Sequence, residues 1–199
     1  NPRPQTSVKP IGPIKVAAGW GRTIAMSARE TRSMRTSGLV LVDAFGHTTT
    51  DDMTAAVEVT STLARKFDAK VMHVPSPGFA SSAEIAESFL ESPPVARALE
   101  QARTADVIIV SVGVIGSESL VLAEGFMTAA AMDHVIAAGA VGEIFGRYFD
   151  AEGNKVDAPG LHPVALTLDE LRNAPRVIGV AAGTEKAPAI RAAIASGIL

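Results

Sequence analysis

The chain has 199 residues and a mass of 20.6 kDa, with a net charge of −3 and a pI of about 5.8. Its 47% hydrophobic and 20% charged residues are typical of a globular domain and exclude a disordered chain. There is no cysteine, which excludes disulfides, thiolate metal sites and a cysteine nucleophile and fits a reducing cytoplasm, where we expect the protein to act. No basic run suits a nucleic-acid backbone, and no apolar run is long enough for a membrane helix.

Residues 1–13 contain four prolines and no apolar core, so we expect a proline-rich linker or arm ahead of one domain over 14–199. The chain does not begin with methionine. Its last residues, Ala195–Leu199, are typical of a helix end that leads into a strand. We therefore expect both ends to be internal to a longer protein.

Five short runs rich in valine and isoleucine are apolar on both faces, as buried parallel strands are. They are Lys15–Ala18, Leu39–Val42, Lys70–Val74, Asp106–Val112 and Arg176–Ala182. Helical patterns alternate with them for most of the length. This alternation predicts one α/β domain with three layers and a mainly parallel sheet.

Helix signals lie between the strands. The 3–4 spacing of apolar residues over Asp51–Phe67 predicts an amphipathic helix. The other helices are marked by capping or helix-ending residues: a capping box of Ser81 and Glu84, Pro94 in a helix to Arg103, Thr128 with Gly139 behind it, and a capping box of Thr167 and Glu170 followed by Pro175.

The segment 142–156 departs from the alternation. Ile144–Phe149 is aromatic, and Asp150–Asn154 is typical of a hairpin turn, so we expect an inserted β-ribbon. We expect Arg147 and Asp150 to pair across it.

Two glycine turns, each between a strand and a helix, are suited to hold an anion. The first is Gly19–Thr23, where main-chain N–H groups, the Thr23 hydroxyl and the Arg22 guanidinium could bind phosphate. The alternative is a tight turn whose glycines serve packing. The second is Gly183–Lys186, where the helix dipole disfavours a lysine unless it meets a bound anion; a solvated lysine is the alternative.

Further candidates follow strands of the same sheet. Gly113 could line a pocket through its main chain, as could Gly46, which precedes the polar residues His47–Thr50. Helix capping is the alternative for Thr49 and Thr50. Glu143 could accept bonds from two sugar hydroxyls, act as an acid or base, or be a surface carboxylate.

The sequence gives little support for a metal site or for nucleophilic catalysis. The four histidines, among them a predicted exposed His134, show no metal-ligand spacing, and no Ser-His-Asp order or nucleophile elbow occurs. Trp20 and Tyr148 could stack on a ligand, although a core or rim position is commoner. We expect no metal, no cofactor and no catalytic residue.

Four stretches, Gly19–Thr23, Ala105–Gly113, Gly139–Asp150 and Val177–Ala193, occur in the order of a known family. Through them the chain resembles the C-terminal effector-binding domain of SorC-type sugar-responsive transcriptional regulators, also called DeoR-type in Gram-positive bacteria. The resemblance covers about residues 15 to 199, and its last two stretches are specific.

The resemblance implies a fold like that of glucosamine-6-phosphate deaminase and ribose-5-phosphate isomerase, used for sensing. It implies a phosphorylated sugar or polyol as effector and a homodimer or homotetramer that holds operator DNA. The family's phosphate loop falls on Gly19–Thr23, its sugar-hydroxyl contact on Glu143 and its phosphate-contacting lysine on Lys186. The expected ligand-binding residues are Gly19, Trp20, Gly21, Arg22, Thr23, Gly46, Gly113, Glu143, Gly183 and Lys186.

The chain departs from the family in lacking its N-terminal helix-turn-helix and the strand and helix that follow in relatives, and 41–46 matches loosely. DNA binding is therefore expected of a missing part, and no membrane partner is expected. Two alternatives remain: a sugar-phosphate isomerase, deaminase or lactonase, for which only Glu143 is an obvious base, and an oligomerisation module.

Overall fold

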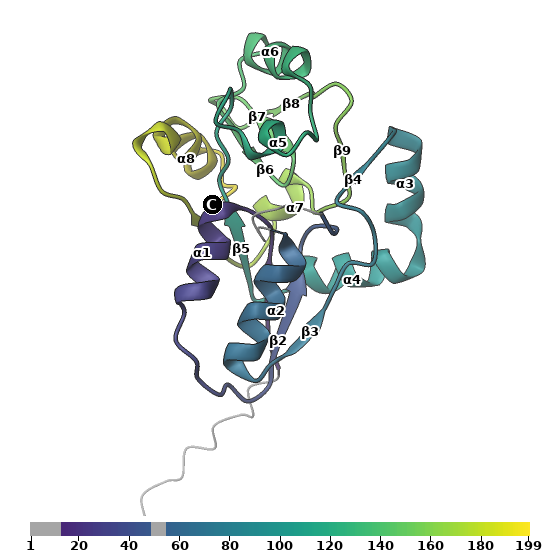
Figure 1. Ribbon diagram of the computed structural model, residues 1–199, viewed down its shortest axis with the longest axis vertical. Coiled ribbons are helices and arrows are strands. Elements are labelled where there is room, and N and C mark those ends of the chain that lie inside the picture. Colours follow the sequence, from purple (N-terminus) through teal and green to yellow (C-terminus); the bar gives the residue numbers. More distant parts are fainter. Residues whose placement is uncertain (1–12, 49–54) are drawn as a thin grey trace, which may run out of the picture.

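The computed structural model describes residues 13–48 and 55–199 (Figure 1). In chain order its elements are β1 (Ile14–Ala18), α1 (Arg22–Glu30), β2 (Leu39–Asp43), α2 (Ala56–Phe67), β3 (Lys70–Met72), β4 (Phe79–Ala80), α3 (Ala83–Glu91), α4 (Pro93–Arg103), β5 (Val107–Ser111), α5 (Leu120–Ala123), α6 (Ala129–Ala137), β6 (Gly142–Ile144), β7 (Arg147–Phe149), β8 (Lys155–Val156), β9 (His162–Pro163), α7 (Leu168–Arg172), β10 (Val177–Val180), the 3₁₀ turn η1 (Thr184–Lys186) and α8 (Ala187–Ala195). The proposed linker and the capping role of Thr49 and Thr50 lie outside the described residues.

The five predicted strands form one sheet in the order β10-β5-β1-β2-β3, with every pair parallel. The strand order reverses between β1 and β5, because the chain winds outward from β1 to β3 and then from β5 to β10. Val16 of β1 is in register with Val107 of β5. The prediction of a mainly parallel α/β domain is confirmed.

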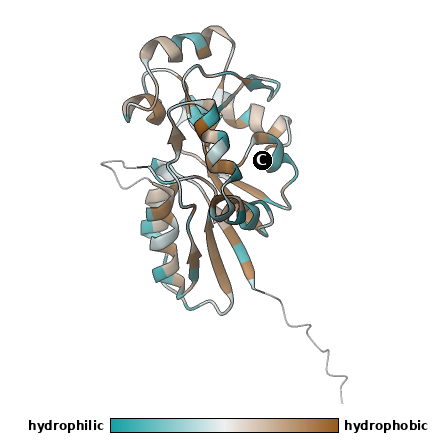
Figure 2. Cartoon of the chain, turned by 90° about the vertical axis from the view of Figure 1, so that its right-hand side faces the viewer, coloured by the Kyte–Doolittle hydropathy of each residue, from teal (hydrophilic) through white to brown (hydrophobic). Residues whose placement is uncertain are grey.

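Helices cover both faces of this sheet. Helices α1 and α2 contact each other and pack on β5 and β2, and α4 packs on β1 and β2 from the other side, with α3 against α4 (Figure 1). The strands are mainly hydrophobic and the helices carry both hydrophobic and hydrophilic residues (Figure 2), and α2 buries Val59, Leu63 and Ala64. This is the arrangement that the 3–4 spacing in 51–67 predicts for α2.

The inserted segment forms a second, antiparallel sheet in the order β6-β7-β8, which lies with α5 and α6 beyond the carboxyl end of β5 (Figure 1). Phe145 and Gly146 turn the chain between β6 and β7 with φ of 58° and 73°, as a two-residue hairpin requires. The predicted turn at Asp150–Asn154 is confirmed, since Asn154 N donates to the Asp150 carboxylate at 2.8 Å. The short β4-β9 pair and helix α5 were not predicted from the sequence.

Helix boundaries follow their capping residues. Thr128 caps α6 and Thr167 closes a capping box at α7, both as predicted. The predicted cap of α3 is wrong by one residue, because Ser82 rather than Ser81 caps the helix. Ile85 N donates to the Ser82 hydroxyl at 3.3 Å. Only Ser82 has the extended backbone that an N-cap needs immediately before the first helical residue.

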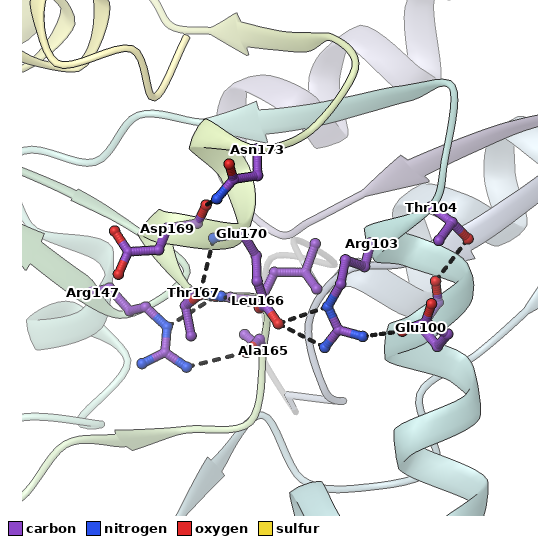
Figure 3. A network of polar contacts seen from close by, with 10 residues as sticks. All are labelled: Glu100, Arg103, Thr104, Arg147, Ala165, Leu166, Thr167, Asp169, Glu170 and Asn173. Atoms are coloured by element: carbon purple, nitrogen blue, oxygen red, sulfur yellow. Dashed lines mark hydrogen bonds and ion pairs between the residues drawn. The ribbon is translucent and has the colours of Figure 1, made fainter.

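The expected pair of Arg147 and Asp150 is wrong. The Arg147 guanidinium donates to the main-chain carbonyls of Leu166 at 2.9 Å and Ala165 at 3.1 Å (Figure 3). Asp150 instead accepts bonds from its own turn. Arg147 therefore links the antiparallel sheet to the segment that precedes α7. In α7, Glu170 accepts a hydrogen bond from Arg103 of α4.

Candidate functional site

A cavity of about 240 Å³ lies where the strand order of the parallel sheet reverses. Parallel α/β sheets bind ligands at this position because the loops after the two adjacent strands diverge and leave a crevice. The loops after β1, β5 and β10 all contribute to the wall. The lining residues are Trp20, Gly21, Arg22, Thr23, Ser111, Gly113, Val114, Glu118, Leu120, Glu143, Ala182, Glu185 and Lys186.

The first wall is the start of α1. Gly21 precedes the helix with φ of 134°, and no side chain caps this end. A Cβ on Gly21 would lie 2.7 Å from the Cβ of Ser111, so glycine allows β1 and β5 to approach here. The uncapped N–H groups carry partial positive charge beside Arg22 and Thr23, which makes this end of the cavity suited to an anion.

Arg22 links this wall to the loop that follows β5. Its guanidinium donates to the main-chain carbonyl of Glu118 at 2.9 Å, while the side chain stays exposed. The contact brings the loop that carries Glu118 and Leu120 over the cavity. One face of the guanidinium fork remains available for a ligand, since a single carbonyl uses only part of its donors.

Lys186 supplies the opposite wall. It ends η1, which Gly183 precedes with φ of 111°, and its ammonium donates to the carbonyl of Val112 at 2.8 Å. Partial burial, followed by the neighbouring Arg22, lowers the pKa of Lys186, while Glu185 and Glu143 raise it. The lysine and Arg22 therefore present two cations to one space.

Glu143 is a buried carboxylate, 6% exposed, on the floor of the cavity. It accepts a hydrogen bond from Gly146 N in the hairpin turn. Burial raises its pKa to about 7, against the lowering effects of the Gly146 bond and of Lys186. The surface alternative for this residue is excluded.

Gly113 makes room for that carboxylate. Gly113 and Glu143 exchange main-chain hydrogen bonds of 2.8 and 3.3 Å, and a Cβ on Gly113 would lie 2.2 Å from Glu143 Oε2. Tyr148, opposite Glu143 in the β6-β7 ladder, is fully buried; burial first, and then Glu143, raises the pKa of its hydroxyl. The floor of the cavity is therefore polar but shielded from solvent.

Trp20 closes the cavity on its inner side. Its indole stacks on Phe45, with ring centroids 5.3 Å apart, and meets the edges of Phe79 and Phe126. Only 4% of the residue is exposed. Trp20 thus belongs to the core and to the cavity wall at once.

The structure brings seven of the ten predicted ligand residues to this cavity: Trp20, Gly21, Arg22, Thr23, Gly113, Glu143 and Lys186. Gly183 sets the turn before Lys186. Gly19 does not line the cavity; it is buried and packs against the Phe145 ring. Gly46 does not line the cavity, because its N–H bonds to Val164 O and its Cα lies against Pro77.

The remaining lining residues were not predicted from the sequence. Ser111 is the second-last residue of the predicted strand Asp106–Val112, and Glu185 lies within the predicted turn Gly183–Lys186, so their positions near strand ends are a signal that could have found them. Glu118 and Leu120 come from a loop whose path depends on the Arg22 contact. Nothing in their local sequence marks them.

The arrangement suits binding of a polyhydroxylated anion. Two cations and an uncapped helix start face a buried carboxylate that can hold hydroxyl groups. None of the four histidines lines the cavity. Within 13–48 and 55–199, no group of three metal-ligating side chains forms, and no helix is long and apolar enough to cross a membrane.

Fold and cavity together define an α/β ligand-binding domain. Comparison with known proteins places it more closely: residues 10–199 match the family described as "Putative sugar-binding domain", and the chain belongs to this family. The resemblance to SorC- and DeoR-type regulators is thereby confirmed.

The curated relatives are transcriptional regulators and not enzymes. The regulator LsrR of Klebsiella pneumoniae is 34% identical over 125 residues, which cover 61% of this chain and 39% of the relative. The erythritol catabolism regulatory protein EryD of Brucella abortus is 24% identical over a region that covers 92% of this chain and 58% of EryD. The chain thus spans about two fifths to three fifths of these relatives.

Solved structures of regulators share the fold. A DeoR family transcriptional regulator from Listeria monocytogenes matches with a TM-score of 0.85 at 24% identity, over 93% of this chain and 73% of that one. The full-length sorbitol operon regulator SorC from Klebsiella pneumoniae matches with a TM-score of 0.83 at 20% identity, over 96% of this chain and 62% of that one.

Proposed function

We propose that this chain is the effector-binding domain of a transcriptional regulator and that its effector is a phosphorylated sugar or polyol held in the cavity. The strongest support is the convergence of Lys186, Arg22 and the uncapped start of α1 on one space of about 240 Å³. A phosphate group would accept hydrogen bonds from all three, and from the Thr23 hydroxyl.

The sugar end of the ligand would lie over Glu143. A buried carboxylate at the floor can accept bonds from two hydroxyls, and hydrogen bonds to a charged acceptor are stronger than those between neutral groups. The regulator EryD is named for erythritol catabolism, so short polyol phosphates belong in any panel of candidates.

Ligand binding would act on operator affinity through loops and subunit packing. A ligand shifts an equilibrium only by the difference in its affinity for the two states. The loop tied to Arg22 through Glu118 O would differ between states, since a phosphate bound by the remaining donors of the guanidinium would shift Arg22 and the loop that it holds. DNA contact would belong to another segment of the regulator, and this chain, with its net charge of −3, is expected not to retard DNA in a gel.

A thermal-shift panel tests the proposal. It contains phosphorylated trioses, tetritols, pentoses and hexoses, each beside its unphosphorylated counterpart. A true effector at 100 times its dissociation constant adds about 2.7 kcal/mol to the free energy of unfolding. Stabilisation by a phosphorylated member alone would support the proposal. No stabilisation by any member would leave an oligomerisation role, and conversion of a member, followed by phosphorus NMR, would favour an enzyme.

A further inference from the structure

We propose that Ser111 is a further binding residue of the cavity and that its hydroxyl donates a hydrogen bond to the phosphate of the effector. This inference rests on the proposed function, because it concerns the same cavity. It adds a contact from the strand that lies between the two glycine turns, which the turns themselves do not supply.

Ser111 lies between the two turns that would hold the anion. It is the last residue of β5, the strand that separates β1 from β10 in the sheet. The turn after β1 leads to Arg22 and Thr23, and the turn after β10 leads to Lys186. Ser111 is in register with Val180, the last residue of β10. A phosphate that contacts both turns would therefore lie over the end of β5, beside Ser111.

The side chain of Ser111 lies on the face of β5 that α1 covers. Alternate residues of a strand share a face, so Ser111 shares this one with Val107 and Ile109, both apolar. Ile109 packs against the core cluster that contains Ile24 of α1. A Cβ on Gly21, the residue before α1, would lie 2.7 Å from Cβ and 2.8 Å from Oγ of Ser111. The polar residue of this face is therefore next to the start of the helix.

No hydrogen bond within the described part of the chain occupies this hydroxyl. Among residues 13–48 and 55–199, the Ser111 side chain takes part in no hydrogen bond, and no side chain caps the start of α1. Ser111 is partly exposed and lines the cavity. Since a serine hydroxyl can donate one hydrogen bond and accept others, it is available to a ligand in this space.

The position favours the phosphate over the sugar end of the ligand. Main-chain N–H groups at a helix start bind anions, and the hydroxyl lies beside such groups. Glu143, proposed for the sugar hydroxyls, pairs instead with the main chain of Gly113, two residues farther along the chain. A hydroxyl that lies between Arg22 and Lys186 would donate to the anionic oxygen that both cations attract, because hydrogen bonds to charged acceptors are the stronger ones.

The experiment compares the wild-type chain with Ser111→Ala, which keeps the Cβ beside Gly21 and removes only the oxygen. Ser81→Ala is the matched control, because Ser81 is exposed, lies outside the cavity and precedes the residue that caps α3. The probes are inorganic phosphate, D-erythritol 4-phosphate, D-ribose 5-phosphate and D-fructose 6-phosphate. Calorimetry at pH 7.5 gives the affinities, and urea unfolding without ligand gives the stabilities.

Ser111→Ala should weaken every probe that binds the wild-type chain by about tenfold or more, the effect of one lost hydrogen bond to a charged acceptor. The loss should be equal for these probes, because the phosphate is the part that they share. Ser81→Ala should bind as the wild type does. Both variants should unfold at the urea concentration that unfolds the wild type.

Unchanged affinity in Ser111→Ala would overturn the inference, and so would a loss whose size depends on the sugar, since the hydroxyl would then contact the sugar end. Easier unfolding of the ligand-free Ser111→Ala variant would assign the hydroxyl a structural role and would also overturn it. In each of these cases the proposed function stands, because the wild-type chain binds a phosphorylated probe. If no probe binds the wild-type chain, both ideas fail together.

Discussion

The ammonium group of Lys186 donates a hydrogen bond of 2.8 Å to the main-chain carbonyl of Val112, 74 residues earlier in the chain. This bond joins the turn after β10 to the end of β5 and so completes the wall opposite α1. Under the proposed function, Lys186 would also donate to the phosphate of the effector. Because the lysine has this structural contact, its contributions to stability and to binding have to be measured side by side in the same variant.

Lys186→Met should weaken a phosphorylated effector by about 10- to 100-fold, the value of one lost charge-assisted hydrogen bond. The free energy of unfolding should change by less than about 1 kcal/mol, because methionine keeps the aliphatic stem and the side chain is only partly buried. Calorimetry and denaturant unfolding measure the two effects. Lys155→Met is the control, since Lys155 is exposed and pairs with Asp157 outside the cavity; equal losses in both variants would contradict the assignment.

Thr23→Val should weaken the same effector by about 10-fold or more, since one hydrogen bond from the hydroxyl to the charged phosphate is lost without a change of shape. Thr23→Ser keeps the hydroxyl and should bind nearly as the wild type does. Affinities from calorimetry decide between the variants. A serine variant as weak as the valine variant would show that the methyl group matters and the hydroxyl does not.

Glu143 should make the stability of the domain depend on pH. Its folded pKa of about 7 lies above the ordinary 4.5, so between these values the unfolded chain releases a proton that the folded chain keeps. Stability therefore falls as the pH rises through this window, by about 3 kcal/mol in all, and the loss is complete above pH 7. Lys186 and Tyr148 are the titratable groups that face this carboxylate.

Glu143→Gln should remove that dependence, because the amide oxygen still accepts from Gly146 N and carries no charge. We expect the variant to be more stable than the wild type at pH 8 and the advantage to shrink toward pH 4.5, measured by urea unfolding across the range. A difference that does not vary with pH would contradict the raised pKa. Effector affinity should fall in the variant, since the neutral amide is a weaker acceptor than a carboxylate.

Gly113→Ala should destabilise the domain and abolish binding, because the added methyl group would lie 2.2 Å from Glu143 Oε2. We expect a loss of about 2 kcal/mol in the free energy of unfolding, typical of overpacking. The double variant Gly113→Ala with Glu143→Ala removes the clash and should recover most of that loss, whereas simple additivity of the two changes would contradict it.

Much of the fold could be predicted from the sequence, because two-sided apolar runs such as Asp106–Val112 have few other uses than buried parallel strands. The turns after β1 and β10 could also be located, since glycines followed by a cation mark a strand-to-helix junction. The helix caps Thr128 and Thr167 are confirmed for the same reason: each depends on a contact within the segment, in which the threonine side chain accepts a hydrogen bond from a nearby main-chain N–H.

What escaped prediction depends on contacts between distant segments. Arg147 had a plausible partner three residues away in Asp150, yet its guanidinium donates to the carbonyls of Ala165 and Leu166. Gly46 follows a strand like Gly113, but Pro77 packs against it. Glu185 lines the cavity with its carboxylate folded close to Gly183, a position that its local sequence does not predict. No local pattern encodes which of several similar residues meets a cavity.

Trp20, the only tryptophan of the chain, should report on the cavity by its fluorescence. The indole is 4% exposed and stacked on Phe45, so native emission should lie at shorter wavelength than that of the unfolded chain. Since Trp20 lines the cavity and meets Phe126, which follows the loop carrying Glu118, an effector that moves this loop should change the intensity.

A fluorescence titration with a stabilising phosphosugar should therefore saturate at the dissociation constant found by calorimetry. The same concentrations should give a much smaller change in the Lys186→Met variant, because its cavity keeps the indole but binds the phosphate about 10- to 100-fold more weakly. A signal change of equal size at the same concentrations in that variant would mean that the sugar phosphate binds beside Trp20 without the lysine, and the assignment of Lys186 as a phosphate contact would be wrong.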